Sequence, residues 1–173
     1  MKANPIYYTV FSTPLGLAGI AGSSKGLCRI SLDIGNEAEF VDFLNRTPVP
    51  SPIKNLQGFA NVIKQFQLYF AGQLTCFTCK LDLSAGTPFQ QKVWRKLMTI
   101  PHGTTRSYRW LAGAIQHPKA FRAVGGANGK NPLPIIIPCH RVIRENGDLG
   151  GYTGGLGIKR FLLDLERVSH GVV

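Results

Sequence analysis

Two side chains capable of nucleophilic chemistry stand side by side in the run PIIIPCHRVI, residues 134–143. A cysteine attacks only as its thiolate, and a free thiol has a pKa near ~8.5, so a base or a positive charge must favour ionisation. Cys139 is followed directly by His140 and Arg141, which can supply both. The competing interpretation is a buried structural cysteine that has no chemical role.

A carboxylate that could orient the histidine lies in the last predicted helix, GIKRFLLDLERV, where Glu166 stands at the edge of the apolar stripe. A partly buried carboxylate needs a partner. Neighbouring side chains of an extended chain point to opposite faces, so His140 reaches Cys139 only through a bend or a bridging water. The residues alone leave open both a Cys139–His140–Glu166 relay and a structural cysteine beside a surface Glu–Arg pair. The predicted buried stripe comprises Ile158, Phe161, Leu162, Leu165 and Ser169.

The segment that carries Cys139 begins with three isoleucines bracketed by Pro134 and Pro138. A short β-branched run bounded by prolines predicts a buried strand or extended segment. Pro138 fixes its own φ and favours extended backbone at the residue before it. Cys139 is therefore expected at a stiff and well-defined point of the chain.

Three short helices are predicted ahead of this segment. The first has a strong start, since Thr87 can act as the N-cap, Pro88 suits the first helical position and Gln90 can complete a capping box. The second begins at Ser107 and ends at Gln116, and the third runs from about Ala120 to Asn128. Two helices joined by a tight turn in a basic region suggest a helix-turn-helix.

The third helix has an unusual composition, AFRAVGGAN, with two adjacent glycines. Each glycine weakens a helix by roughly 1 kcal/mol. The alanines and glycines give this helix a flat face, which permits close approach either to another helix or to a nucleic-acid groove. In the second case Arg122 would project into the groove from the first turn.

The first half of the chain alternates between strand-like and helix-like patterns. We expect an antiparallel meander, two helices and a final strand, with a domain boundary at residues 84–86. The predicted elements are strands Tyr7–Ser12, Leu17–Ala21 and Leu27–Leu32, a helix Asn36–Arg46, a rigid connector at 47–52, an amphipathic helix Leu56–Phe70 and a strand Leu74–Leu83.

Charge is distributed unevenly along the 173 residues, whose formal net charge is +11. Residues 1–83 hold 7 Lys and Arg against 5 Asp and Glu, whereas residues 84–173 hold 13 against 4. A basic half favours a polyanionic partner, with a generally basic protein as the equal alternative. No apolar run approaches the ~18 residues that a membrane span needs, and the N-terminus lacks the apolar core of a signal peptide. We therefore expect a cytoplasmic protein with reduced cysteines and no membrane contact.

The second half of the chain contains the motifs SY, FRAVGGA, NPLPIIIPCHRVI and GGYTGGL, followed by K, LL and E. Together these motifs resemble the signature of O6-alkylguanine-DNA alkyltransferases. PCHRV is the active-site motif of that family. The resemblance covers roughly residues 84–166 with the spacings intact, whereas the N-terminal half is similar only in layout and length. It implies an α/β (α+β) protein with a ribonuclease-H-like domain at 1–83 and a mostly helical, winged helix-turn-helix domain at 84–173.

The resemblance implies a suicide repair protein that transfers an alkyl group irreversibly from O6 of guanine to Cys139. His140 would generate the thiolate through a bound water, and Glu166 would orient the imidazole. Tyr108 falls at the tyrosine that donates to the departing guanine, and Asn131 at the asparagine that orders the active-site turn. No metal and no cofactor is implied.

The resemblance also implies the DNA contacts and the substrate pocket. The partner would be double-stranded DNA containing O6-alkylguanine, bound through the minor groove with the damaged nucleotide flipped out. Arg122 would fill the resulting gap. We expect a monomer, with clustering on DNA left open. The remaining helix positions are Ala123, Gly125, Gly126 and Ala127, and the implied pocket residues are Val142, Tyr152, Thr153 (often serine in the family) and Lys159.

Two other functions remain open from the residues. A cysteine hydrolase would use Cys139, His140 and Glu166 as a triad and turn over repeatedly, without needing a basic helix pair. A non-enzymatic winged helix-turn-helix protein would leave Cys139 inert. Cys76 and Cys79 form a C-x-x-C spacing, but in the predicted strand they face opposite sides, so we do not expect a metal site there.

Overall fold

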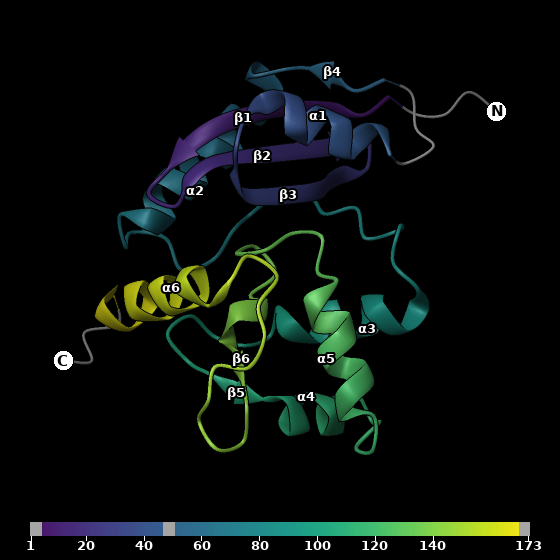
Figure 1. The fold of residues 1–173 in the computed structure, drawn as a ribbon, viewed down its shortest axis with the longest axis vertical. Coiled ribbons are helices and arrows are strands. Elements are labelled where there is room, and N and C mark those ends of the chain that lie inside the picture. Colours follow the sequence, from purple (N-terminus) through teal and green to yellow (C-terminus); the bar gives the residue numbers. More distant parts are fainter. Residues whose placement is uncertain (1–4, 47–50, 170–173) are drawn as a thin grey trace. The chain divides into compact units, whose positions relative to one another are not determined.

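The structure is a computed structural model, and it describes residues 5–46 and 51–169. The chain folds into two compact units, residues 1–83 and 84–173 (Figure 1). Within the described ranges, no helix is both long and apolar enough to span a membrane. The predicted α/β class, with an N-terminal antiparallel sheet and a helical C-terminal part, is confirmed.

The first unit is built on a four-stranded sheet with the order β3-β2-β1-β4 (Figure 1). The first three strands form the predicted antiparallel meander, and β4 adds a short parallel edge to β1 that the sequence pattern did not indicate. Most of the connector predicted at 47–52 lies outside the described residues. The strands are β1 (Tyr7–Thr13), β2 (Gly16–Ser23), β3 (Gly26–Ile34) and β4 (Ile53–Lys54).

Helices cover both faces of this sheet. On one face, Phe40 of α1 (Glu37–Asn45) packs edge-on against Tyr8, with a ring-centroid distance of 6.3 Å. On the other, Phe66 of α2 (Ala60–Phe70) packs against Phe11 at 5.4 Å. Residues 8 and 11 of one strand point to opposite faces, so the sheet is sandwiched between the two helices. A 3₁₀ turn, η1 (Gln57–Phe59), leads into α2.

Close packing of α1 on the sheet makes Gly19 intolerant of a side chain. A Cβ placed there would lie 2.5 Å from Cγ of Phe40, which is 1% exposed and has little room to move. We expect Gly19→Ala to lower the free energy of unfolding by about 1–3 kcal/mol, the usual cost of overpacking. Urea denaturation measures this. Gly113→Ala is the control, since its Cβ meets nothing within 4 Å among the described residues. An unchanged midpoint for Gly19→Ala would contradict the packing argument.

The strand predicted at Leu74–Leu83 is wrong. Only one bridge forms, between Leu27 and Leu81, with Leu27 N donating to Lys80 O at 2.8 Å. Upstream of it the backbone turns to the α2 side chains instead: Thr78 N donates to Gln65 Oε1 at 2.7 Å. The two cysteines at 76 and 79 therefore lie in irregular backbone, and the strand argument about their orientation does not apply.

The second unit is mainly helical, and its first helices start as the sequence predicts (Figure 1). Thr87 and Gln90 form a complete capping box at α3, and Ser107 caps α4 by accepting from Trp110 N at 3.0 Å. The indole of Trp94 in α3 donates to Ala127 O of α5 at 2.8 Å, which ties these helices together. The elements are α3 (Pro88–Leu97), β5 (Arg106–Ser107), α4 (Tyr108–Ala114), α5 (Phe121–Gly129), η2 (Cys139–Arg141), β6 (Val142–Ile143) and α6 (Leu156–Ser169).

A small parallel pairing connects the cysteine segment to the start of α4. β5 pairs with β6, with Arg106 opposite Val142 and Ser107 opposite Ile143. Because β6 directly follows η2 and β5 directly precedes α4, this pairing fixes Tyr108 relative to Cys139, although 30 residues separate them in the sequence.

The isoleucine run forms a turn rather than the predicted strand or extended segment. Ile135 has φ +75, a conformation that a β-branched residue rarely adopts. Ile137 N donates back to Leu133 O, and Cys139 N donates to Ile137 O, both at 2.8 Å. Pro138, with φ −80 and ψ 62, is thus the centre of an inverse γ-turn. The segment is stiff and buried as expected, but it is stiff because it is tightly folded.

The predicted buried stripe of α6 is correct for Leu162, which is fully buried, but wrong for Phe161, and Ile158, Leu165 and Ser169 are only half-buried. Phe161 is 38% exposed, whereas Lys159, Leu162 and Glu166 are at most 1% exposed. Lys159, Leu162 and Glu166 stand at positions i, i+3 and i+7 and therefore share one face of the helix, but two of these three residues are charged. Their burial is possible because each has partners on the cysteine segment and the loop after it.

Candidate active site

Cys139 sits at the first position of η2, with 5% of its surface exposed. Its Sγ accepts a hydrogen bond from Asn131 Nδ2 at 3.0 Å, and the same amide donates to Ile137 O at 2.7 Å. Asn131 Oδ1 accepts from Leu133 N at 2.9 Å. One side chain therefore holds the turn at both ends and touches the sulfur.

Burial raises the pKa of the Cys139 thiol above its ordinary value. The Asn131 hydrogen bond, the Lys159 ammonium and the Tyr152 hydroxyl all act in the opposite direction but do not outweigh burial. The resting group is thus a thiol that already has donors and a cation in place for its anion. A base is needed to remove its proton.

His140 follows in the 3₁₀ turn and is fully buried. Its Nε2 lies 2.8 Å from Glu166 Oε1, across 26 positions of sequence. Burial lowers the pKa of His140, and the hydrogen bond that the ring donates to Glu166 only partly offsets this effect. The imidazole is neutral near pH 7 as a result.

The hydrogen-bond network fixes which nitrogen of His140 carries the proton. Burial raises the pKa of Glu166, but the hydrogen bonds from His140 and Arg141 outweigh it and hold that pKa well below its usual range. Glu166 is therefore an acceptor, so Nε2 must be the protonated nitrogen of the neutral ring. Nδ1 keeps its lone pair, and it is buried with no hydrogen-bond partner among the described residues. It is the atom able to accept a proton.

Arg141 completes the pairing of the buried carboxylate. Its Nε donates to Glu166 Oε2 and its Nη2 to Oε1, both at 2.8 Å, which is a bidentate arrangement. Its Nη1 donates to Ile100 O at 2.6 Å, and Gly103 N donates to Glu166 Oε2 at 3.1 Å. Each carboxylate oxygen thus accepts two hydrogen bonds, and α6, η2 and the turn after α3 are joined at one point.

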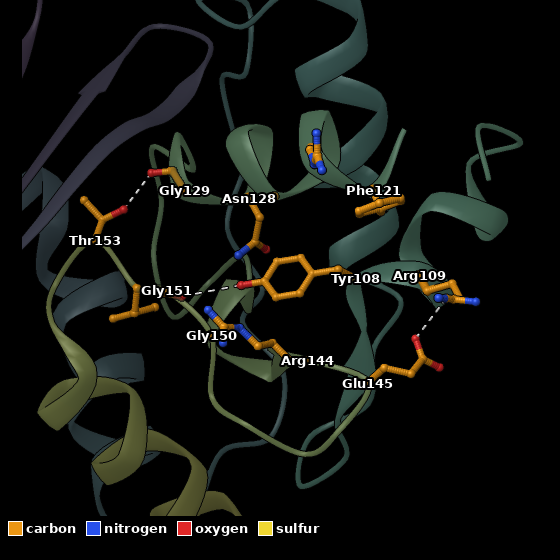
Figure 2. Close-up of a pocket in the computed structure, with 13 residues that line it drawn as sticks. Tyr108, Arg109, Phe121, Asn128, Gly129, Arg144, Glu145, Gly150, Gly151 and Thr153 are labelled. Carbon is orange, nitrogen blue, oxygen red and sulfur yellow. Dashed lines mark hydrogen bonds and ion pairs between the residues drawn. The ribbon is translucent and has the colours of Figure 1, made fainter. Parts of the chain in front are cut away.

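A cavity of about 780 Å³ opens in front of this arrangement (Figure 2). Asn128 lies in its lining and also donates to Cys139 O at 3.4 Å, so the backbone of Cys139 lies directly behind the lining, of which Cys139 is not itself a member. Three of the lining residues are arginines and one is acidic. The lining comprises Tyr108, Arg109, Phe121, Arg122, Gly125, Asn128, Gly129, Arg144, Glu145, Gly150, Gly151, Tyr152 and Thr153.

Tyr108 extends across the cavity, and its hydroxyl donates to Gly151 O at 3.5 Å (Figure 2). Burial and the nearby Cys139 raise its pKa, with Arg144 opposing them. Tyr152 has its pKa raised further, again by burial and then by Cys139. Both phenols remain protonated at neutral pH and are able to donate.

The loop that forms the far wall is held by Lys159 and Thr153. Lys159 Nζ donates to Val142 O at 2.6 Å, to Gly151 O at 3.4 Å and to Leu149 O. Burial lowers the pKa of Lys159 to about 8, with Cys139 opposing that shift. Thr153 Oγ1 donates to Gly129 O at 2.6 Å, which links the loop to the end of α5 (Figure 2). Lys159 and Val142 are buried behind the cavity rather than in its lining.

The glycines of α5 are not required by packing. A Cβ at Gly126 would meet nothing within 4 Å among the described residues, and one at Gly125 would make only ordinary contacts of 3.8 Å with Tyr108. Of the predicted DNA-contacting positions, Arg122 and Gly125 line the cavity, whereas Ala123 and Gly126 are exposed. Ala127 is 4% exposed and faces the core. The helix therefore presents an open face of small residues.

Several residues of the site were not found from the sequence. Arg109, Phe121, Arg144 and Glu145 line the cavity, and Arg109 pairs with Glu145 at 3.4 Å. For Phe121, the sequence did offer a signal that it belongs to the site, because it directly precedes Arg122 on the small-residue helix. Arg141 was considered only as a charge near the thiol, yet its geometry makes it the main partner of Glu166.

Two family models match this chain. The one described as "6-O-methylguanine DNA methyltransferase, ribonuclease-like domain" matches residues 6–83, and "6-O-methylguanine DNA methyltransferase, DNA binding domain" matches residues 88–168. Together they define the class: a ribonuclease-like unit followed by a DNA-binding unit that carries the cysteine.

Individual relatives agree with this class. A protein of Bacillus subtilis named "Methylated-DNA--protein-cysteine methyltransferase, constitutive" is 45% identical over 165 residues, covering 95% of this chain and 97% of the relative. One of Methanosarcina acetivorans is 44% identical over 162 residues, covering 93% and 98%. The crystal structure of Mycobacterium tuberculosis OGT in complex with DNA superposes with a TM-score of 0.81 at 43% identity, covering 94% of each chain. The chain belongs to the 6-O-methylguanine DNA methyltransferase family.

Proposed function

We propose that this protein repairs DNA by transferring an alkyl group from O6 of guanine to Cys139, once per molecule. It is a methylated-DNA–protein-cysteine methyltransferase. The observation that carries the assignment to Cys139 is the arrangement around it: a buried thiol held by Asn131, next to a neutral His140 whose Nε2 is bound by ionised Glu166, behind a basic cavity.

The proposed transfer is a displacement at the alkyl carbon. The Cys139 proton passes through a bound water to His140 Nδ1, and the thiolate then forms an S–C bond as the C–O6 bond breaks. The electron pair stays on the guanine oxygen. The departing guanine takes a proton from the Tyr108 hydroxyl, which is then reprotonated from His140. The product thioether has no leaving group that the site can activate, so the protein acts once.

Glu166 acts on this chemistry through His140 and is a positioning residue. It keeps Nε2 protonated, which leaves Nδ1 as the acceptor. Asn131 and Lys159 stabilise the sulfur anion, since both lower the pKa of Cys139. The wall of the cavity formed by Tyr152 and Thr153 would receive the guanine, with Val142 behind it.

The partner is DNA, and we infer that α5 enters the minor groove of a duplex that contains O6-alkylguanine. An alkyl group on O6 is enclosed within the base pair, so the nucleotide must rotate out, at a cost of a few kcal/mol. Arg122 would occupy the gap and offset part of that cost. The open Ala123, Gly125 and Gly126 face allows close approach, and cations around the cavity supply affinity for phosphate. Ala127 would support this face from the core side.

The finer properties are also proposals. We take residues 1–83 and 84–173 as separate domains, with both DNA binding and chemistry in the second. We infer a protein that acts as a monomer in the cytoplasm. The excess of cations in residues 84–173, 13 Lys and Arg against 4 Asp and Glu, is consistent with a nucleic-acid partner for that unit.

Intact mass spectrometry after mixing with a duplex that carries one O6-methylguanine tests the proposal. We expect the protein mass to rise by one methylene unit, because a methyl group replaces the thiol proton, with one equivalent consumed and the group located on Cys139. Repeated turnover on a thioester without any adduct would favour a hydrolase. DNA binding without an adduct under reducing conditions would favour an inert DNA-binding protein.

A further inference from the structure

The first residue of α5 is an aromatic residue left largely in water, since Phe121 is 48% exposed. Isolated exposed apolar side chains are common, so exposure alone says little. Phe121 differs because it lines the cavity, directly before Arg122, on the helix proposed to approach DNA. Neither the chemistry nor the folding of the unit, as described above, uses this ring.

Phe121 and Arg122 form a pair at one end of the helix. The guanidinium carbon of Arg122 lies 6.0 Å from the centroid of the Phe121 ring. Figure 2 shows the ring at the opposite end of α5 from Asn128 and Gly129, toward Arg109. A planar cation and a planar apolar ring are thus presented side by side, and either can stack on a nucleobase.

Distance along the helix separates Phe121 from the reacting atoms. Asn128, which contacts the Cys139 carbonyl, is seven residues further along α5. At a rise of about 1.5 Å per residue, the two positions are about 10 Å apart along the axis. The alkyl carbon must touch the sulfur during transfer, so Phe121 lies too far out to contact it. If the damaged nucleotide enters the cavity as proposed, its neighbours in the duplex would lie on the side of Phe121.

We propose that Phe121 stacks on a base next to the everted nucleotide and, together with Arg122, holds the duplex open. This inference rests on the proposed function. Rotating a nucleotide out of the helix leaves the adjacent base without one of its stacking partners. An aromatic ring restores that contact whatever the base is, because every base has a π face. Apolar wedges of this kind are used by proteins that bend DNA through the minor groove.

Single-turnover kinetics on two substrates tests this role. We expect Phe121→Ala to slow transfer from an O6-methylguanine duplex about tenfold, as expected for the loss of one base–aromatic stack. Transfer from the free O6-methylguanine base should change by less than about twofold, because no duplex has to be held open. Phe121→Trp should keep the duplex rate. Met98→Ala removes a side chain of similar exposure, 41%, outside the cavity lining and should match the wild type on both substrates.

Each other outcome overturns the inference in a recognisable way. A wild-type duplex rate in Phe121→Ala shows that the ring does not stabilise the open duplex. An equal loss on the duplex and the free base places its effect within the cavity or on folding instead. A wild-type protein that transfers from neither substrate overturns the proposed function, and the role of Phe121 with it.

Discussion

A Cys139→Ser protein is expected to bind an O6-methylguanine duplex normally and to transfer nothing. Loss of the rate should exceed ~10³-fold, because the sulfur anion is the group that forms the new bond. Serine is the informative replacement because its hydroxyl can accept the Asn131 hydrogen bond that Sγ accepts now, at 3.0 Å. The turn should therefore survive. A hydroxyl is far less acidic than a thiol, so a neutral histidine cannot supply the anion.

The measurement pairs intact mass with a gel-shift titration on the same duplex. Cys76→Ser is the matched control, because Cys76 is an exposed free thiol on the other unit. It should gain one methylene unit at the wild-type rate. A methylated Cys139→Ser protein, or a Cys76→Ser protein that cannot be methylated, would move the acceptor away from Cys139.

Local signals in the sequence were sufficient for the helix starts. Thr87 and Gln90 form their capping box with hydrogen bonds three residues apart, so the pattern contains the whole interaction. The same holds for Ser107 at α4. The strands of the meander were predictable because their turns are short and carry glycine.

The predictions that failed depend on partners distant in sequence. The stripe of α6 was assigned by hydropathy, which left Lys159 out and placed Glu166 only at the edge of the buried face. They are buried because Lys159 donates to three carbonyls and Glu166 accepts from Arg141, His140 and Gly103. No pattern within the helix shows those partners. A buried ion is stable only when paired, and the pairing arises from the tertiary fold.

The turn at Ile135 was missed for a related reason. Three β-branched residues favour a strand, and only the surrounding structure can hold one of them at φ +75. That conformation folds the chain back so that Asn131 reaches both Ile137 O and Cys139 Sγ. The sequence indicated which residues take part in the chemistry, through adjacency and through the family resemblance. It did not indicate that a strained turn places them.

Replacing Glu166 with glutamine is expected to cause the largest loss of stability of any single change in the site. The carboxylate is 1% exposed and accepts four hydrogen bonds, two on each oxygen. An amide of the same shape places an NH₂ where donors already point, and it leaves the Arg141 cation buried without its counter-charge. Breaking a buried pair on one side costs about 3–5 kcal/mol. Asp164→Asn, an exposed change on the same helix, should leave the free energy of unfolding nearly unchanged.

Acid dependence provides a second readout of the Glu166 substitution. The folded pKa of Glu166 lies below its unfolded value of about 4.3, so its stabilisation is complete above about pH 5 and is lost as pH falls toward the folded pKa. His140 also makes the free energy of unfolding fall with decreasing pH, and its effect begins at a higher pH. The folded pKa of His140 lies below the unfolded value of about 6.5, so the unfolded chain binds the proton first. Urea titrations from pH 4 to 8 should show the wild type losing stability at the acid end. The Glu166→Gln curve should be lower throughout and flatter below about pH 5.

The pH–rate profile separates a structural role of Glu166 from one in the relay. Without the carboxylate, no negative charge favours the protonated form of His140, so the ring is a poorer base and the effective pKa of the Cys139 thiol rises. Transfer by Glu166→Gln, measured where the variant is still folded, should therefore show its ascending limb at higher pH than the wild type. The Asp164→Asn profile should coincide with that of the wild type. A Glu166→Gln profile that keeps the wild-type midpoint, with only the amplitude reduced, would mean that the carboxylate supports the fold and takes no part in activating the thiol.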